Sequence, residues 1–141
     1  MTRVVGILAA AVLLGLATLH IYWASGGQWA TDATIPKRDG APLFTPSPAS
    51  TLLVAALLGT AALVLLGRVG VWGRWLPRWP FVVGTWTLIA VFGARVVGDL
   101  RWFGLFKRMT GTSFAWWDTW LYVPLCALLA LASLLVACSE P

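Results

Sequence analysis

The chain has 141 residues, of which 60% are hydrophobic and only 11% are charged. Soluble domains carry about 25% charged residues, and a globule of this size leaves much of its surface in contact with water. The few ionisable side chains cannot cover that surface, so the excess apolar surface requires lipid. The composition therefore excludes an ordinary soluble domain.

The formal net charge of +5 raises the question of nucleic-acid binding. Such binding requires basic residues gathered on one water-facing patch. Here Arg and Lys stand in short clusters between apolar runs, which is the distribution that membrane insertion selects. We therefore expect the basic residues to meet membrane lipids and no nucleic acid.

Four apolar runs predict an all-α polytopic membrane protein that forms one domain over residues 1–141. The first run, residues 4–23, lacks formal charge and as a helix would span a hydrocarbon core of about 30 Å. Backbone groups in lipid must bond within their own segment, so every run is expected to be helical. The expected helices of the bundle cover residues 4–24, 49–67, 80–99 and 119–138.

The first run has an alternative interpretation as a cleaved signal peptide, because Arg3 precedes it and small residues follow at positions 24–26. Its length exceeds the usual apolar region of about 7 to 15 residues in such peptides. Tyr22 and Trp23 at its end are typical of the membrane interface. These features favour a helix that is retained in the mature protein.

The connection over residues 100–119 mixes aromatic and basic side chains. We expect a short helix in the headgroup plane, whose apolar face holds Trp102, Phe103, Phe106 and Met109. We expect the basic side chains of this connection to contact headgroup phosphates: Arg101, Lys107 and Arg108.

The orientation in the membrane follows from the distribution of Lys and Arg, which is nearly even between the two sides. The short connection over residues 68–80 carries three arginines, Arg68, Arg74 and Arg78. Their density favours the cytoplasmic side for this connection, and hence for both termini, in a multi-pass protein of the cell membrane.

Helices that alternate in direction bring three segments to one membrane side: the end of the first, the end of the third and the start of the fourth. That side collects most of the polar residues and several aromatic residues: His20, Tyr22, Trp23, Trp29, Arg95, Asp99, Arg101, Asp118 and Tyr122. The sequence thus predicts a polar, aromatic-lined pocket at one membrane face.

Arg95 and Asp99 stand four residues apart, so we expect them to pair on one face of the third helix. Ionisable residues within a membrane favour a functional role. The structural alternative is a packing ion pair, with His20 donating to a backbone carbonyl and Asp118 capping the fourth helix. Both interpretations stay open at this point.

Short motifs are spread over most of the chain in a recognisable order. They are His20-Ile21-Tyr22-Trp23-Ala24, Gly26-Gly27, Trp29, Arg95, Gly98-Asp99, Arg101, Phe106-Lys107-Arg108, Asp118-Thr119, Tyr122 and Pro124-Leu125-Cys126. This pattern resembles a bacterial family of small four-helix membrane proteins that carries only a domain-of-unknown-function label. The resemblance implies the architecture and brings no activity, substrate or catalytic residue.

Several chemistries lack the residues that they require. The chain has one His, so a zinc site would need Asp and Cys from three helices, and a bis-histidine haem site is impossible within one chain. Cys126 and Cys138 would lie about 18 Å apart along one helix, too far for a disulfide. We therefore expect no metal and no cofactor.

Two classes of function fit the predicted pocket. The first is a non-catalytic protein that binds a lipid, another apolar small molecule, or a membrane partner such as a second copy of the chain. Its candidate binding residues are Tyr22, Trp23, Trp29, Arg95, Arg101, Lys107, Arg108 and Asp118. The second is a membrane enzyme, of isomerase or cyclase type, acting on an isoprenoid or lipid. Its candidate acid and base residues are His20, Asp99 and Tyr122.

Overall fold

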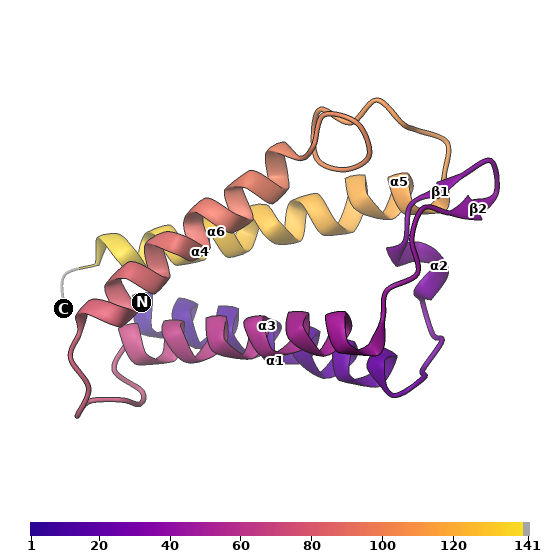
Figure 1. Ribbon diagram of the computed structural model, residues 1–141. Coiled ribbons are helices and arrows are strands. Elements are labelled where there is room, and N and C mark those ends of the chain that lie inside the picture. The colour runs from indigo at the N-terminus through magenta and orange to yellow at the C-terminus, as the bar shows by residue number, and fades with distance from the viewer. Residues whose placement is uncertain (140–141) are drawn as a thin grey trace.

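The structure is a computed structural model that describes residues 1–139 (Figure 1). In chain order its elements are α1 (Thr2–Ala24), α2 (Thr31–Thr34), β1 (Lys37–Arg38), β2 (Ala41–Pro42), α3 (Pro48–Arg68), α4 (Trp79–Val97), α5 (Ser113–Trp117), the π-helical turn η1 (Asp118–Tyr122) and α6 (Val123–Cys138). The two short strands form an antiparallel hairpin in which Lys37 lies opposite Pro42.

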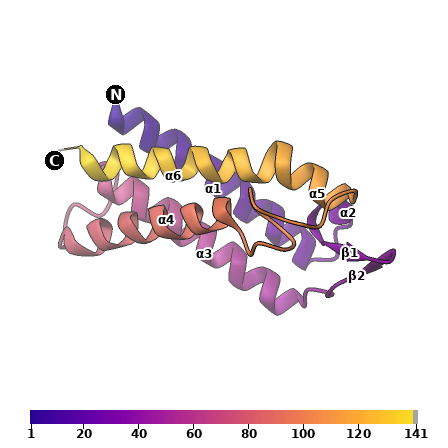
Figure 2. The ribbon, with the colours of Figure 1, turned by 90° about the horizontal axis from the view of Figure 1, so that it is seen from above.

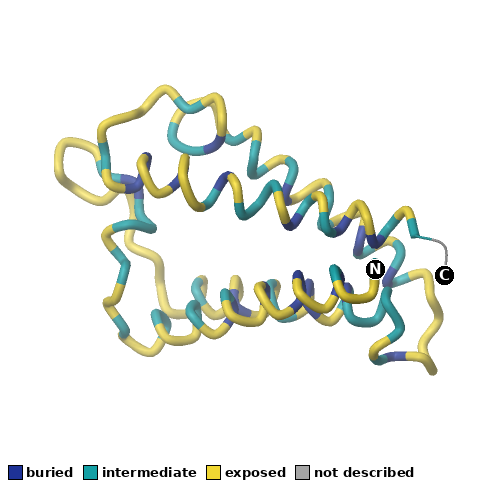
Figure 3. Tube along the Cα trace, turned by 180° about the vertical axis from the view of Figure 1, so that it is seen from behind, coloured by how far each residue is buried: buried dark blue, intermediate teal, exposed yellow. Residues whose placement is uncertain are grey.

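Four helical segments of the described chain are long and apolar enough to cross a membrane: Thr2–Ala24, Pro48–Arg68, Trp79–Val97 and Ser113–Cys138. Large apolar side chains cover their outer sides, with Leu57 61% exposed and Leu128 64% exposed. Figure 3 shows exposed positions along the whole length of the long helices, with shorter buried stretches between them. The prediction of an all-α polytopic membrane protein is confirmed.

The helices associate in two antiparallel pairs, α1 with α3 and α4 with α6, and the pairs cross when seen from above (Figure 2). They come together at the end that holds the N-terminus and the connection from α3 to α4. They diverge toward the end that holds α2 and α5 (Figure 1). We call these the narrow end and the wide end.

The shared core joins all four long helices. Most of the core residues that α1 and α3 contribute are alanines, so these two helices can approach closely. The larger core side chains come mainly from α4 and α6. The buried residues of this cluster are Ala9, Ala10, Leu13, Ala61, Ala62, Leu65, Phe92, Leu129 and Val136.

The fourth spanning segment begins at Ser113, earlier than the predicted position 119, because α5, η1 and α6 run on without a break. Pro124 lacks a backbone N–H and cannot bond to the carbonyl one helical turn before it. The N–H of Val123 instead bonds to the carbonyl of Asp118, five residues earlier. This wider turn is the π-helical turn η1.

The headgroup-plane helix predicted within the connection over residues 100–119 is wrong for residues 100–112, which hold its expected apolar face. These residues form an irregular loop, and Gly98, Leu100, Gly104 and Gly111 all have positive φ, which an α-helix does not allow. The backbone of Gly98 also lies so close to that of Gly104 that neither position has room for a Cβ. The loop therefore folds back on the end of α4.

Candidate functional site

The carboxylate of Asp118 is fully buried at the wide end, where it joins three parts of the chain. Its Oδ1 accepts from Nη2 of Arg95 on α4 at 2.6 Å. Its Oδ2 accepts from Nζ of Lys107 at 3.0 Å and from the backbone N–H of Gly104 at 2.8 Å. Two cations and one amide thus satisfy a carboxylate that burial would otherwise penalise.

The predicted ion pair between Arg95 and Asp99 is wrong, since Arg95 pairs with Asp118. The helix α4 ends at Val97 and Gly98 turns the chain, so Asp99 no longer shares a helical face with Arg95. Nor does Asp118 cap the last spanning segment. That role falls to Thr112, whose Oγ1 accepts from the N–H of Ala115 at 3.1 Å.

Asp99 organises the start of the loop that follows α4. Its Oδ1 accepts from the N–H groups of Arg101, Trp102 and Phe103 at 2.9, 2.7 and 3.1 Å. Partial desolvation raises the pKa of the Asp99 carboxyl, but these three donors outweigh it and hold the pKa below its ordinary value of 3.8. Asp99 is therefore a carboxylate that shapes the loop.

The Lys107 ammonium is held entirely by the protein. Besides Asp118, it donates to Oγ1 of Thr119 at 2.7 Å and to the carbonyl of Gly104 at 3.3 Å. All three of its N–H bonds are thus occupied. The neighbouring guanidinium of Arg95 lies over the ring of Phe103, 4.5 Å from the ring centre.

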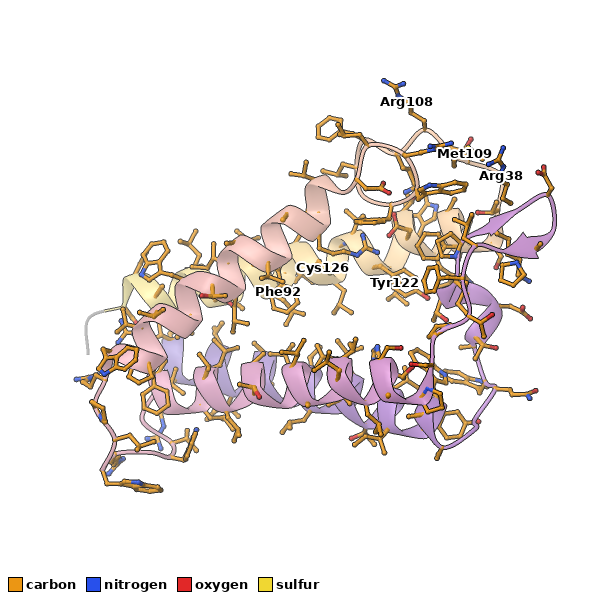
Figure 4. All side chains as sticks on the ribbon, viewed as in Figure 1. Arg38, Phe92, Arg108, Met109, Tyr122 and Cys126 are labelled. Atoms are coloured by element: carbon orange, nitrogen blue, oxygen red, sulfur yellow. The ribbon has the colours of Figure 1, made fainter. Side chains whose placement is uncertain are left out.

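A cavity of about 560 Å³ opens between the two helix pairs toward the wide end. Most of its lining is apolar and includes Val54 and Leu58 of α3. Figure 4 shows Phe92, Tyr122 and Cys126 on the side of α4 and α6 that faces the other pair. Five residues that the sequence singled out also line it: His20, Trp23, Trp29, Arg95 and Tyr122.

Hydrogen bonds hold the polar groups of this cavity. The hydroxyl of Tyr122 in η1 donates to the carbonyl of Ala33 in α2 at 3.0 Å, which ties η1 to the first connection. Nδ1 of His20 lies 2.8 Å from the carbonyl of Leu16. A carbonyl only accepts, so Nδ1 carries the hydrogen of this bond. The predicted bond from His20 to a backbone carbonyl is confirmed.

The other singled-out residues lie outside the cavity lining. The exposed Tyr22 packs its ring against Gly27, and its hydroxyl accepts from the N–H of Trp29 at 3.5 Å. Arg101 is exposed, with its guanidinium 5.4 Å from the ring centre of Trp102. Arg108 extends from the outer edge of the wide end (Figure 4). Asp99, Lys107 and Asp118 likewise do not line the cavity.

The sequence did not indicate that α3 lines the cavity or that the buried Gly104 donates its N–H to Asp118. Val54 and Leu58 are ordinary apolar residues of a spanning helix, and only their position opposite α6 makes them lining residues. Within the described residues, no group of three or more His, Cys, Asp or Glu side chains could hold a metal ion. Cys126 and Cys138 are free thiols.

We predict that Asp118→Asn lowers the free energy of unfolding by about 3–5 kcal/mol, because it leaves the half-buried Arg95 and the buried Lys107 without a counter-charge. Denaturation by sodium dodecyl sulfate in mixed micelles, followed by circular dichroism, measures the loss. The matched control is Asp39→Asn. Asp39 is exposed and lies 3.7 Å from Arg38, so its loss should be at most about 0.5 kcal/mol. Equal losses would contradict the assigned role of Asp118.

We predict that Asp99→Ala removes the hydrogen-exchange protection of the amides of Arg101, Trp102 and Phe103. In the wild-type protein the same protection depends on pH. The folded pKa of Asp99 lies below 3.8, so its stabilisation is complete above that pH and is lost as the pH falls through the folded pKa. Exchange measured by mass spectrometry tests both effects, and unchanged protection in the variant refutes the assignment.

The sequence and the structure were compared with known protein families, curated proteins and solved structures. No curated protein and no solved structure matches it. A family model described as protein of unknown function (DUF3995) matches residues 13–133, which include all four long helices in whole or in large part. The chain belongs to this family.

Proposed function

We propose that this protein resides in the cell membrane and binds a lipid or another apolar small molecule in the cavity between its two helix pairs. The observation that carries the proposal is the cavity of about 560 Å³ with its mostly apolar lining. Small-molecule sites in proteins measure roughly 300 to 1,000 Å³ and combine such a lining with a few polar groups.

The arrangement of the lining supports an amphiphilic ligand. Phe92 and Leu129 line the cavity and also belong to the core, so the deep part of the cavity is apolar. Arg95, Tyr122 and His20 also line it and stand in the parts of their helices nearest the wide end. An apolar chain directed inward and a polar head near these residues would satisfy both regions.

The residues present favour binding over the isomerase or cyclase chemistry that the sequence left open. Of the candidate acid and base residues, Asp99 does not line the cavity, and His20 and Tyr122, which line it, are each hydrogen-bonded to a backbone carbonyl. Asp99 is bonded to its own loop, and Asp118 is held by Arg95 and Lys107. The Tyr122 hydroxyl is engaged with the carbonyl of Ala33. Asp99, Asp118 and Tyr122 thus stabilise the segments around the cavity.

We predict that Val54→Trp lowers the amount of lipid or apolar compound that co-purifies with the protein by at least about tenfold, because the indole fills the cavity that Val54 lines. Native mass spectrometry of the protein in detergent, together with mass spectrometry of its organic extract, measures the occupancy. A ligand bound by such a lining loses its contacts when the volume is occupied.

The matched control is Leu53→Trp, one residue away on the same helix. Leu53 is 61% exposed and does not line the cavity, so its substitution should leave the occupancy unchanged. The proposal fails if the wild-type protein carries no such compound, or if both variants retain the compound equally. Circular dichroism of both variants verifies that they remain helical.

We also propose that both termini face the cytoplasm. The narrow end holds the N-terminus and the connection with Arg68, Arg74 and Arg78, and positively charged connections of this length remain inside. A green fluorescent protein fused to the C-terminus should then fluoresce in a bacterial host. Alkaline phosphatase inserted after Gly40, in the exposed hairpin of the wide end, should be active. The reverse pattern would refute this orientation.

A further inference from the structure

A second cavity, of about 270 Å³, lies at the narrow end, separate from the cavity of the proposed function. It is enclosed by the end of α3, the connection over residues 69–78 and the start of α4. Arg68, Arg74 and Arg78 line it together with Trp72 and Phe81. Three arginines and two aromatic residues thus line a small space at the narrow end.

The backbone around this cavity offers the guanidinium groups few acceptors. The α3 helix ends in a Schellman motif, in which the N–H of Gly70 bonds to the carbonyl of Gly67 and the N–H of Val71 to that of Leu66. The carbonyls of Leu66 and Gly67 are therefore occupied. Arg74 uses only Nε, which donates to the carbonyl of Gly70 at 3.1 Å. Its terminal nitrogens remain for a ligand.

Arg68 holds the base of the cavity in place. Its Nη2 donates to the carbonyls of Ala137 and Ser139 at 3.1 and 3.4 Å, where α6 ends. Its Nε is buried and has no partner among the described residues. The Arg68 side chain thus bridges α3 and α6 and places positive charge beneath the cavity.

The local electrostatics favour an anion. The aspartates of the described chain, Asp32, Asp39, Asp99 and Asp118, all belong to segments of the wide end. The α4 helix also begins at this cavity, directly after Arg78, and the N-terminus of a helix carries partial positive charge. Three cations and a helix N-terminus therefore act on one small volume, at an interface that screens them less than bulk water does.

We propose that this cavity binds the phosphate group of an anionic phospholipid. Arginine presents N–H donors in the geometry that phosphate oxygens accept, and basic pockets between spanning helices bind lipid headgroups. Trp72 and Phe81 supply apolar surface for the glycerol and upper chain region of the lipid. The surrounding leaflet supplies such a lipid directly.

The test uses the full chain in detergent, equilibrated with phosphatidylglycerol or with phosphatidylcholine and examined by native mass spectrometry. The wild-type protein should retain phosphatidylglycerol in preference to phosphatidylcholine. Arg74→Gln and Arg78→Gln should each lower the retained phosphatidylglycerol about fivefold. Arg74→Lys, which keeps the charge, should retain more than Arg74→Gln.

Arg3→Gln is the matched control, because Arg3 is an exposed cation near the same end of the molecule and does not line the cavity. It should leave the retention unchanged. Equal loss in Arg3→Gln and in the cavity variants would indicate diffuse attraction and overturn the proposal, as would unchanged retention in the cavity variants. Inorganic phosphate that binds wild type while phosphatidylglycerol does not would overturn the lipid assignment.

Discussion

The buried carboxylate of Asp118 is the interaction on which the wide end of this molecule depends. A lone carboxylate in this environment would be strongly destabilising, and its two cations and one amide donor come from outside its own helix. Arg95 connects it to α4, while Gly104 and Lys107 connect it to the loop that follows α4. Removing one partner of such a network leaves the others buried and uncompensated. The loop is thereby held against the last spanning segment.

The cavity between the helix pairs lies beside this network, because Arg95 both pairs with Asp118 and lines the cavity. Small residues bring α1 and α3 together, and the shared core joins the two pairs below the cavity. Toward the wide end the pairs separate, and there the hydroxyl of Tyr122 in η1 bonds to the carbonyl of Ala33 in α2. The positively charged group that lines the cavity, Arg95, is held by an aspartate behind it. The cavity is therefore mostly apolar, with His20, Arg95 and Tyr122 as polar residues toward the wide end.

The two ends of the molecule differ in charge, and the two ligands that we propose differ accordingly. The aspartates of the described chain all lie toward the wide end, where they organise loops and neutralise cations. The narrow end carries Arg68, Arg74 and Arg78 around a small cavity, and the carbonyls of Leu66 and Gly67 beside it are already bonded. An amphiphile in the large cavity and a phosphate group in the small one are compatible, because separate residues form the two sites.

The sequence by itself determined the spanning helices, because a helix satisfies its backbone within its own apolar run and needs no information from the rest of the chain. It also located His20, Trp23, Trp29, Arg95 and Tyr122 on one side through the alternation of helix direction. The partner of Arg95 was decided only by the tertiary structure. Spacing favoured Asp99, but Gly98 ends the helix first, and the loop brings Gly104 and Lys107 to a carboxylate 23 residues from Arg95. The lining residues of α3 were decided in the same way, since an apolar side chain that faces a cavity differs from one that faces lipid only in what lies opposite.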